Sequence, residues 1–211
     1  APANYLPSNL FSSSRLFGGY DSYSGEDYFE GKTDSGALFK FSELKVTDTT
    51  TTTDSDGKSR TTTTTIFDGM FFVLEVPNRV GGRVQVLPDM AESTLGFLGK
   101  FIQKSLGSLF QGAKMVYLDE HPEFEKAFVV YSQNEEEAYR ILTPALIKSI
   151  YDLRYKWNVS LSLSFIDNQI YVALSTSKIS FNPISKKAFW KMNYWMNYTM
   201  NWHSVFQWLK T

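Results

Sequence analysis

The run Met70-Phe71-Phe72-Val73-Leu74 constrains the fold more than any other part of this chain. Its side chains are apolar at consecutive positions, so both faces of an extended segment would be apolar. Such a segment is typical of a central strand that is covered on both sides. The preceding Asp68-Gly69 has the composition of a two-residue turn and predicts a hairpin whose first strand is residues 64–67. The sequence therefore predicts an antiparallel sheet.

Further strands are expected before and after this run. Tyr28-Phe29 lies between two glycines, and residues 38–46 alternate with a slip near Ser42-Glu43 that predicts a bulge. Residues 159–165 and 170–174 alternate around Asp167-Asn168, which predicts a second hairpin with one buried face and a wet serine face.

Residues 47–65 contain eleven threonines around the segment Asp54-Ser-Asp-Gly-Lys58. Threonine is β-branched and favours extended backbone, whereas the central Asp, Gly and Lys favour a turn. The pattern predicts an exposed hairpin tip or a mobile loop. Neither a phosphate-binding loop nor a calcium-binding loop fits, because Thr52 and Thr63 stand where those motifs need other residues.

Helices are predicted after Pro88. Apolar residues at helical spacing run from Leu95 to Leu109, and a short strand is expected at residues 115–118. Ser132-x-x-Glu135 has the form of a capping box, and Thr143-Pro144 has the form of a new helix start. The stripe of the second helix consists of Leu146, Ile150, Leu153 and Trp157.

Residues 176–211 carry five lysines, nine aromatic side chains and no acidic residue. Their apolar positions recur at helical spacing, which predicts a long, lysine-flanked helix. Three interpretations remain open: a core or subunit-interface helix, a helix lying in a membrane interface, and a nucleic-acid stacking surface. The third is the least expected, because lysine is sparse in the middle of the segment. The candidate contacts to a membrane or protein partner are Trp190, Trp195, Trp202 and Trp208.

The composition excludes several kinds of site. The chain has no cysteine and two histidines, His121 and His203, so thiol catalysis and Cys-based metal sites are ruled out. The net charge of −1 gives no field that would select nucleic acid. No catalytic motif is recognisable, and we expect no cofactor and no resident metal.

Two acidic clusters and one arginine are the remaining candidates for a ligand site. Glu26, Asp27 and Glu43 lie on expected strands, and a second group surrounds His121. Paired carboxylates can do acid–base work when their surroundings separate their pKa values, but exposed charges are the commoner case. Arg140 follows Glu136 and Glu137 at helical spacing, which favours an exposed ion pair over a ligand clamp.

Several short blocks, in order, resemble an uncharacterised bacterial family, the domain of unknown function family 3137. They include Gly25-Glu-Asp-Tyr-Phe-Glu-Gly31, Phe41-Ser-Glu-Leu44, Gly69-Met-Phe-Phe72, Val86-Leu-Pro-Asp89, Phe124-Glu-Lys-Ala-Phe-Val-Val-Tyr131, Tyr139-Arg-Ile-Leu-Thr-Pro-Ala145 and Ser164-Phe-Ile-Asp167. The resemblance covers residues 20–174 and brings no catalytic residue. It implies a membrane tether upstream of residue 1. We expect the domain formed by this chain to lie in the cytoplasm.

These observations give an α+β fold: an antiparallel meander with packed helices, a second hairpin and a long C-terminal helix. The expected division is a lead-in segment (1–19), the α+β domain (20–175) and the C-terminal helix (176–211). The leading function is non-enzymatic binding or scaffolding in a membrane-associated bacterial protein. The alternatives are a carboxylate-based enzyme, with or without a divalent metal, and a homo-oligomeric structural module.

Overall fold

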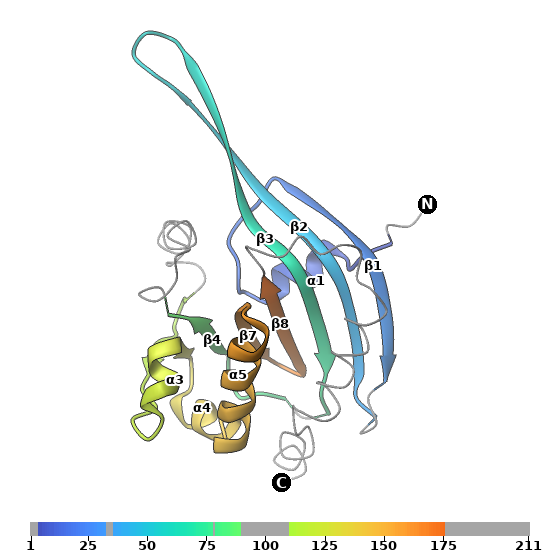
Figure 1. Cartoon of the computed structure of the whole chain (residues 1–211), viewed down its shortest axis with the longest axis vertical. Helices are drawn as coiled ribbons and strands as arrows, with labels where there is room; N and C mark the ends of the chain where they lie inside the picture. The colour runs from blue at the N-terminus through green and yellow to red at the C-terminus, as the bar shows by residue number, and fades with distance from the viewer. Residues whose placement is uncertain (1–3, 33–35, 78, 90–109, 176–211) are drawn as a thin grey trace.

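The computed structural model describes residues 4–32, 36–77, 79–89 and 110–175, and these residues form one eight-stranded antiparallel sheet (Figure 1). The strand order is β1-β2-β3-β8-β7-β4-β6-β5. Strands make up 48% of the described residues and helices 22%, so the fold is mostly β. The predicted α+β class is therefore wrong. The main reason is that residues expected as turns or loops lie within two unusually long strands.

The strands are β1 (Ser22–Lys32), β2 (Leu38–Thr53), β3 (Ser59–Glu75), β4 (Val84–Pro88), β5 (Lys114–Val116), β6 (Phe128–Ser132), β7 (Ser160–Ile166) and β8 (Gln169–Ser175). The helices are α1 (Ser8–Ser13), α3 (Pro122–Ala127), α4 (Glu135–Ile141) and α5 (Pro144–Trp157). The expected helices at residues 95–109 and 176–211 lie outside the described residues. Within them, no helix combines the length and the apolar character needed to cross a membrane.

Strand β3 is covered on both faces, as its sequence predicted. Met70, Phe72 and Leu74 belong to a core cluster that includes buried residues of α3, α4 and α5. Phe71 and Val73 belong to a second cluster, which contains Phe11 of α1 and other residues of the N-terminal segment. We call these two sides of the sheet the helix face and the α1 face. The N-terminal segment is thus part of the second core.

The predicted turn at Asp68-Gly69 is wrong, because both residues lie within β3. Gly69 pairs with Leu44 of β2 on one side and Ser175 of β8 on the other. Its φ of +152° and the close approach of the Leu174 carbonyl explain the glycine. A glycine inside a strand often marks a close approach of another backbone.

The predicted bulge lies on the opposite strand. The register shifts between Glu26 and Phe29 of β1, which face Glu43 and Phe41 of β2. Asp27 and Tyr28 of β1 stand opposite the single residue Ser42 of β2, and Asp27 has a φ of +55°. A second irregularity falls where Val46 gives way to Thr47 in β2.

Residues 47–53 and 59–65 form a two-stranded hairpin that projects beyond the rest of the sheet (Figure 1), which confirms the hairpin alternative. We call it the threonine ribbon. At its tip, Asp54 Oδ1 accepts hydrogen bonds from the backbone N–H groups of Asp56 and Lys58, at 3.1 and 2.8 Å. Gly57 closes the turn with a φ of +76°. The ribbon therefore forms from turn chemistry and β-propensity, without an apolar side chain of its own.

The second predicted hairpin is confirmed as β7 and β8, with Asp167 at a positive φ in the turn. Its serine face is not wet, however. Ser164 is fully buried and Ser160 and Ser162 are half-buried. The pairing partner of Ser164 is Tyr171, a buried residue of the second cluster. The serines are thus covered on the α1 face.

The two helix starts differ in outcome. Thr143 caps α5 as predicted, because its side chain accepts a hydrogen bond from the N–H of Leu146. The capping-box prediction is wrong: Asn134, not Ser132, caps α4 by accepting from the N–H of Glu137. Ser132 instead accepts a hydrogen bond from the N–H of Asn134, at 3.0 Å.

Candidate functional site

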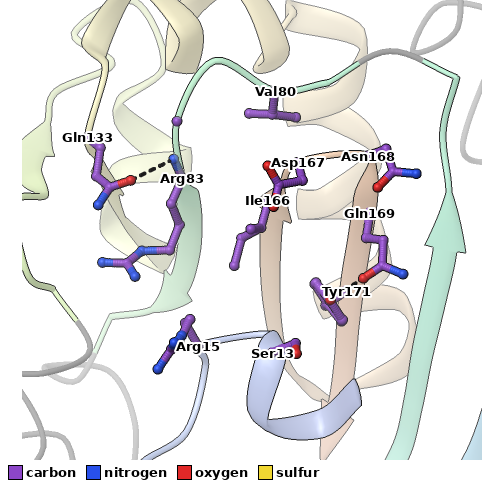
Figure 2. Close-up of a pocket in the computed structure, with 11 residues that line it drawn as sticks. Ser13, Arg15, Val80, Arg83, Gln133, Ile166, Asp167, Asn168, Gln169 and Tyr171 are labelled. Carbon is purple, nitrogen blue, oxygen red and sulfur yellow. Dashed lines mark hydrogen bonds between the residues drawn. The ribbon is translucent and has the colours of Figure 1, made fainter. Parts of the chain in front are cut away.

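A cavity of about 520 Å³ opens on the α1 face, where the end of α1, the start of β4 and the β7–β8 turn meet (Figure 2). Its walls are mostly polar, and two arginines stand on the side nearest α1 and β4. The lining residues are Ser13, Arg15, Val80, Gly82, Arg83, Gln133, Ile166, Asp167, Asn168, Gln169 and Tyr171.

Arg15 is held in an uncommon backbone conformation. It follows α1 with a φ of +55°, a region that most L-residues avoid. Its carbonyl accepts a hydrogen bond of 2.6 Å from Nε2 of the buried Gln85. The next residue is fixed as well, since the N–H of Leu16 donates to Ser14 Oγ. The backbone of Arg15 is therefore anchored to β4, while its side chain is exposed.

Arg83 lies immediately before β4 and lines the cavity. Its backbone N–H donates to Gln133 Oε1 at 3.1 Å, and its guanidinium donates to the Gln111 carbonyl at 3.4 Å. Its Nε is buried and has no hydrogen-bond partner. Burial lowers the pKa of Arg83, and the nearby charge of Arg15 lowers it further. Two cations thus face one cavity, and within the described residues neither forms a salt bridge.

The opposite wall is formed by the β7–β8 turn. Asp167 is the acidic residue of the lining, and its carboxylate is already paired with Arg79 at 2.5 Å. The hydroxyl of Tyr171 donates a hydrogen bond to Gln169 Oε1, and burial raises the pKa of this phenol. The cavity therefore offers two arginines without an ion-pair partner, opposite a carboxylate that is neutralised by a third.

This arrangement suits an anion. A guanidinium presents a planar set of N–H donors that matches the oxygens of phosphate or carboxylate. A buried Nε without a partner is costly until an acceptor reaches it. A bound oxyanion between the two guanidinium groups would relieve the repulsion between Arg15 and Arg83.

The structure brings three of the predicted site residues together, but they do not line this cavity. Glu26 and Glu43 are register partners across β1 and β2, and Asp27 lies in the adjacent bulge. Burial raises the pKa of Glu43, and the charges of Glu26, Asp27 and Asp68 add to the effect. Within the described residues, no group of three acidic or histidine side chains has the arrangement needed to hold a metal ion.

Glu43→Gln is expected to stabilise the protein near neutral pH by up to about 1 kcal/mol. A carboxyl whose pKa is raised in the folded state favours folding when protonated. The charged form therefore destabilises the fold above that raised pKa. The gain should disappear as the pH falls through the raised pKa towards the ordinary value of a glutamate. Urea unfolding at a series of pH values measures this.

Glu120→Gln is the control, because it makes the same change at an exposed glutamate outside the acidic group. A gain that persists unchanged at low pH, or that Glu120→Gln reproduces, would contradict the electrostatic explanation.

Arg140 lies far from these acids in sequence and serves a different contact. Its Nε donates to Glu137 Oε2 at 3.0 Å, and Glu137 Oε1 also accepts from the N–H of Gly81. Glu137 is buried; burial alone would raise its pKa, but the hydrogen bonds from Arg140 and Gly81 lower it. The pair thus fastens the segment before β4 to α4. The candidate contacts Trp190, Trp195, Trp202 and Trp208 lie outside the described residues.

Sequence reasoning missed Arg15 and Arg83. Both are isolated arginines in irregular segments, with no motif around them. Gln85 was the available signal, because it is a polar residue between two valines, Val84 and Val86. It is fully buried and its Oε1 has no hydrogen-bond partner. A buried amide of this kind points to an organised polar site above it.

Comparison with known structures gives one slight likeness. A crystal structure described as the mycobacterial trehalose monomycolate transport factor A, TtfA, aligns over 89% of this chain and 75% of that chain. The TM-score is 0.46 and the sequence identity is 9%, which is too little to carry fold or function across. No curated protein matches the chain.

A family profile described as "Protein of unknown function (DUF3137)" matches residues 65–210. The match begins within β3 and continues through residue 210, so it includes nearly all of the tryptophan-rich segment, residues 176–211. The blocks before residue 65 lie outside it. Because the profile covers more than half of the sequence, the chain belongs to this family of unknown function.

Proposed function

We propose that this protein is a non-enzymatic binding domain that holds a phosphate or carboxylate group between Arg15 and Arg83. One observation supports this most directly: the Arg83 guanidinium is part-buried beside Arg15, and its Nε has no partner. Within the described residues, no carboxylate forms a salt bridge with either arginine. An anionic ligand would complete this site.

The anchoring of both residues favours binding that needs little reorganisation. The Gln85–Arg15 and Gln133–Arg83 hydrogen bonds join each arginine backbone to the sheet before a ligand arrives. Preorganisation reduces the conformational entropy that a ligand would otherwise have to offset. The volume of about 520 Å³ lies within the range of small-molecule sites, about 300–1,000 Å³.

Binding is favoured over catalysis by the chemistry of the lining. The residues around the cavity include no histidine, and Asp167 is occupied by Arg79. The phenol of Tyr171 has a raised pKa, so it is protonated at neutral pH and is a poor base.

Titration calorimetry with inorganic phosphate, at constant ionic strength, tests the proposal. Arg15→Gln and Arg83→Gln should each weaken binding by about 10- to 100-fold, because each removes a charged donor set. Arg60→Gln is the matched control. It removes the same charge from the exposed threonine ribbon and should leave binding unchanged. Circular dichroism confirms that each variant is folded.

Binding to lipid vesicles distinguishes two sources of the bound anion, a soluble compound and a lipid headgroup. Sedimentation with phosphatidylglycerol vesicles that is lost in Arg83→Gln, and is absent with phosphatidylcholine, would assign the anion to a headgroup. Phosphate binding without vesicle binding would assign it to a soluble compound. Phosphate binding that none of the arginine variants changes, or no binding to either probe, would refute the site.

Membrane association through residues 176–211, or through an upstream tether, stays a prediction of the sequence. Family membership assigns no activity to the chain. The anionic site is independent of both predictions, because every residue that forms it lies in α1 or just after it, in the segments around β4 and β6, or in the β7–β8 hairpin.

A further inference from the structure

The threonine ribbon has two free edges within the described part of the chain. Strand β1 reaches only as far as Ser22, which pairs with Thr47, and β8 ends at Ser175, which pairs with Gly69. Beyond these points β2 and β3 pair only with each other, and most of the ribbon is exposed (Figure 1). Free strand edges carry backbone N–H and C=O groups that can pair with another strand.

The hydrogen bonds at the base of the ribbon show which residues of β2 direct their backbone N–H and C=O groups away from β3. The N–H of Asp21 donates to the Thr47 carbonyl at 3.0 Å, and the N–H of Thr49 donates to Asp21 Oδ2 at 2.8 Å. Outward groups therefore fall on the odd-numbered residues of β2. Their cross-strand partners on β3, Thr63 and Thr61, must also present their backbone groups outward.

The hydroxyl contacts agree with this assignment. Thr49 and Thr63 hydroxyls lie 3.3 Å apart, and those of Thr51 and Thr61 lie 3.1 Å apart. Side chains approach most closely in the pairs whose backbone groups point away from each other. The even-numbered residues of β3 thus hold the ribbon together, while the odd-numbered ones are free to accept a partner.

The two edges differ in protection. Asp21 already occupies the N–H of Thr49 on the β2 edge. On the β3 edge, residues 61–65 are all threonine, with none of the charges, prolines or bulges that usually block edge pairing. Opposed threonines in neighbouring strands stabilise a sheet. The β3 edge is therefore the open one, and it is suited to a strand of its own composition.

We propose that the β3 edge of the ribbon pairs antiparallel with the same edge of a second copy of this chain, with the two-fold axis at Thr62. In this register Thr61 faces Thr63 of the second copy, and Thr63 faces its Thr61. Both members of each pair have outward backbone groups, so each pair exchanges two hydrogen bonds. Thr62 faces its own counterpart in the intervening non-hydrogen-bonded pair.

Charge complementarity selects this register. Arg60 faces Thr64 of the second copy, and the cross-strand partner of Thr64 is Asp48. Opposed residues share a face of the sheet, so Arg60 of one copy lies on the same face as Asp48 of the other, two strands away. That is about 10 Å between backbones, which the two extended side chains can bridge. The symmetry produces this ion pair twice.

Sedimentation velocity of the full chain tests the proposal, from about 10 µM to about 1 mM, because a short interface is expected to be weak. The intact protein should reach the mass of two chains with rising concentration. Thr61→Pro and Thr63→Pro should each shift the dissociation constant at least about 10-fold towards monomer. Each removes an outward N–H that the ribbon itself does not use.

Thr51→Pro is the matched control, since it makes the same change on the opposite edge, directly across from Thr61. It should leave association unchanged. Asp48→Arg and Arg60→Asp should each weaken association, and the double variant should restore it. This rescue tests the register and is unaffected by any binding of phosphate at Arg15 and Arg83.

If the chain stays monomeric up to about 1 mM, the proposal is overturned, even if the β3 edge binds a different protein. Equal effects of Thr51→Pro and Thr61→Pro would overturn it too. A dimer that ignores both β3 proline variants would place the interface elsewhere.

Discussion

Phe71→Ala is expected to lower the free energy of unfolding by about 4 kcal/mol. Phe71 is fully buried in the C-terminal part of β3 and contacts three other rings of the α1 face: Phe11, Phe67 and Tyr171. Their ring centroids lie 5.0 to 6.2 Å from that of Phe71. Removing the ring leaves a cavity that α1 and the sheet can only partly fill, so the loss exceeds that of transfer alone.

Urea unfolding of Phe71→Ala and Phe29→Ala makes the comparison. Phe29 is the matched control, because it is the same side chain at 41% exposure on edge strand β1. Its replacement should cost about 1 kcal/mol or less. Losses of similar size in the two variants would mean that the α1 face is not a packed core.

Gly69→Ala is expected to cost about 3 kcal/mol or more, through two separate effects. The φ of +152° is strained for any residue with a side chain. A Cβ at this position would also collide with the Leu174 carbonyl oxygen and lie 3.1 Å from its carbon. Backbone of a central strand cannot move aside without disturbing the β3–β8 pairing.

Two other glycines separate these effects in the same unfolding assay. Gly57→Ala adds a Cβ at a φ of +76° with nothing within 4 Å, so it should show only the backbone cost, about 1 kcal/mol. Gly19→Ala has open space and no unusual φ, and should be close to neutral. If Gly69→Ala matches Gly57→Ala, the strands do not approach as closely as described.

Sequence patterns predicted the elements whose side chains repeat regularly. The doubly apolar β3, the alternating β7–β8 hairpin and the Thr143-capped α5 were all predicted. The patterns failed where one residue type serves two purposes. Asp68-Gly69 has turn composition, but the glycine is there because β8 comes close, and no local signal reports a strand about 100 residues away. This error, with the length of the threonine ribbon, produced the wrong fold class.

The candidate site was less predictable than the fold. Glu26, Asp27 and Glu43 were predicted because they are acidic residues on expected strands, and Glu26 and Asp27 are adjacent in the sequence. Arg15 and Arg83 have nothing in common in the sequence. They meet because the carbonyl of Arg15 accepts a hydrogen bond from Gln85, two residues after Arg83. The pairing of β4 with β6 and β7 then places both arginines in the lining of the same cavity.

The β3–β8 pairing has a consequence for biosynthesis. It joins residues 69–75 to residues 169–175, and β8 lies directly beside the central strand. While the chain is being translated, the nascent meander β1–β2–β3 has no neighbour on its β3 side until β8 has been made. At about 5–20 residues per second, this interval is roughly 5–20 s. During that time the apolar run of β3 is exposed to aggregation or to chaperones, so translation speed and chaperone supply should influence the yield of native protein.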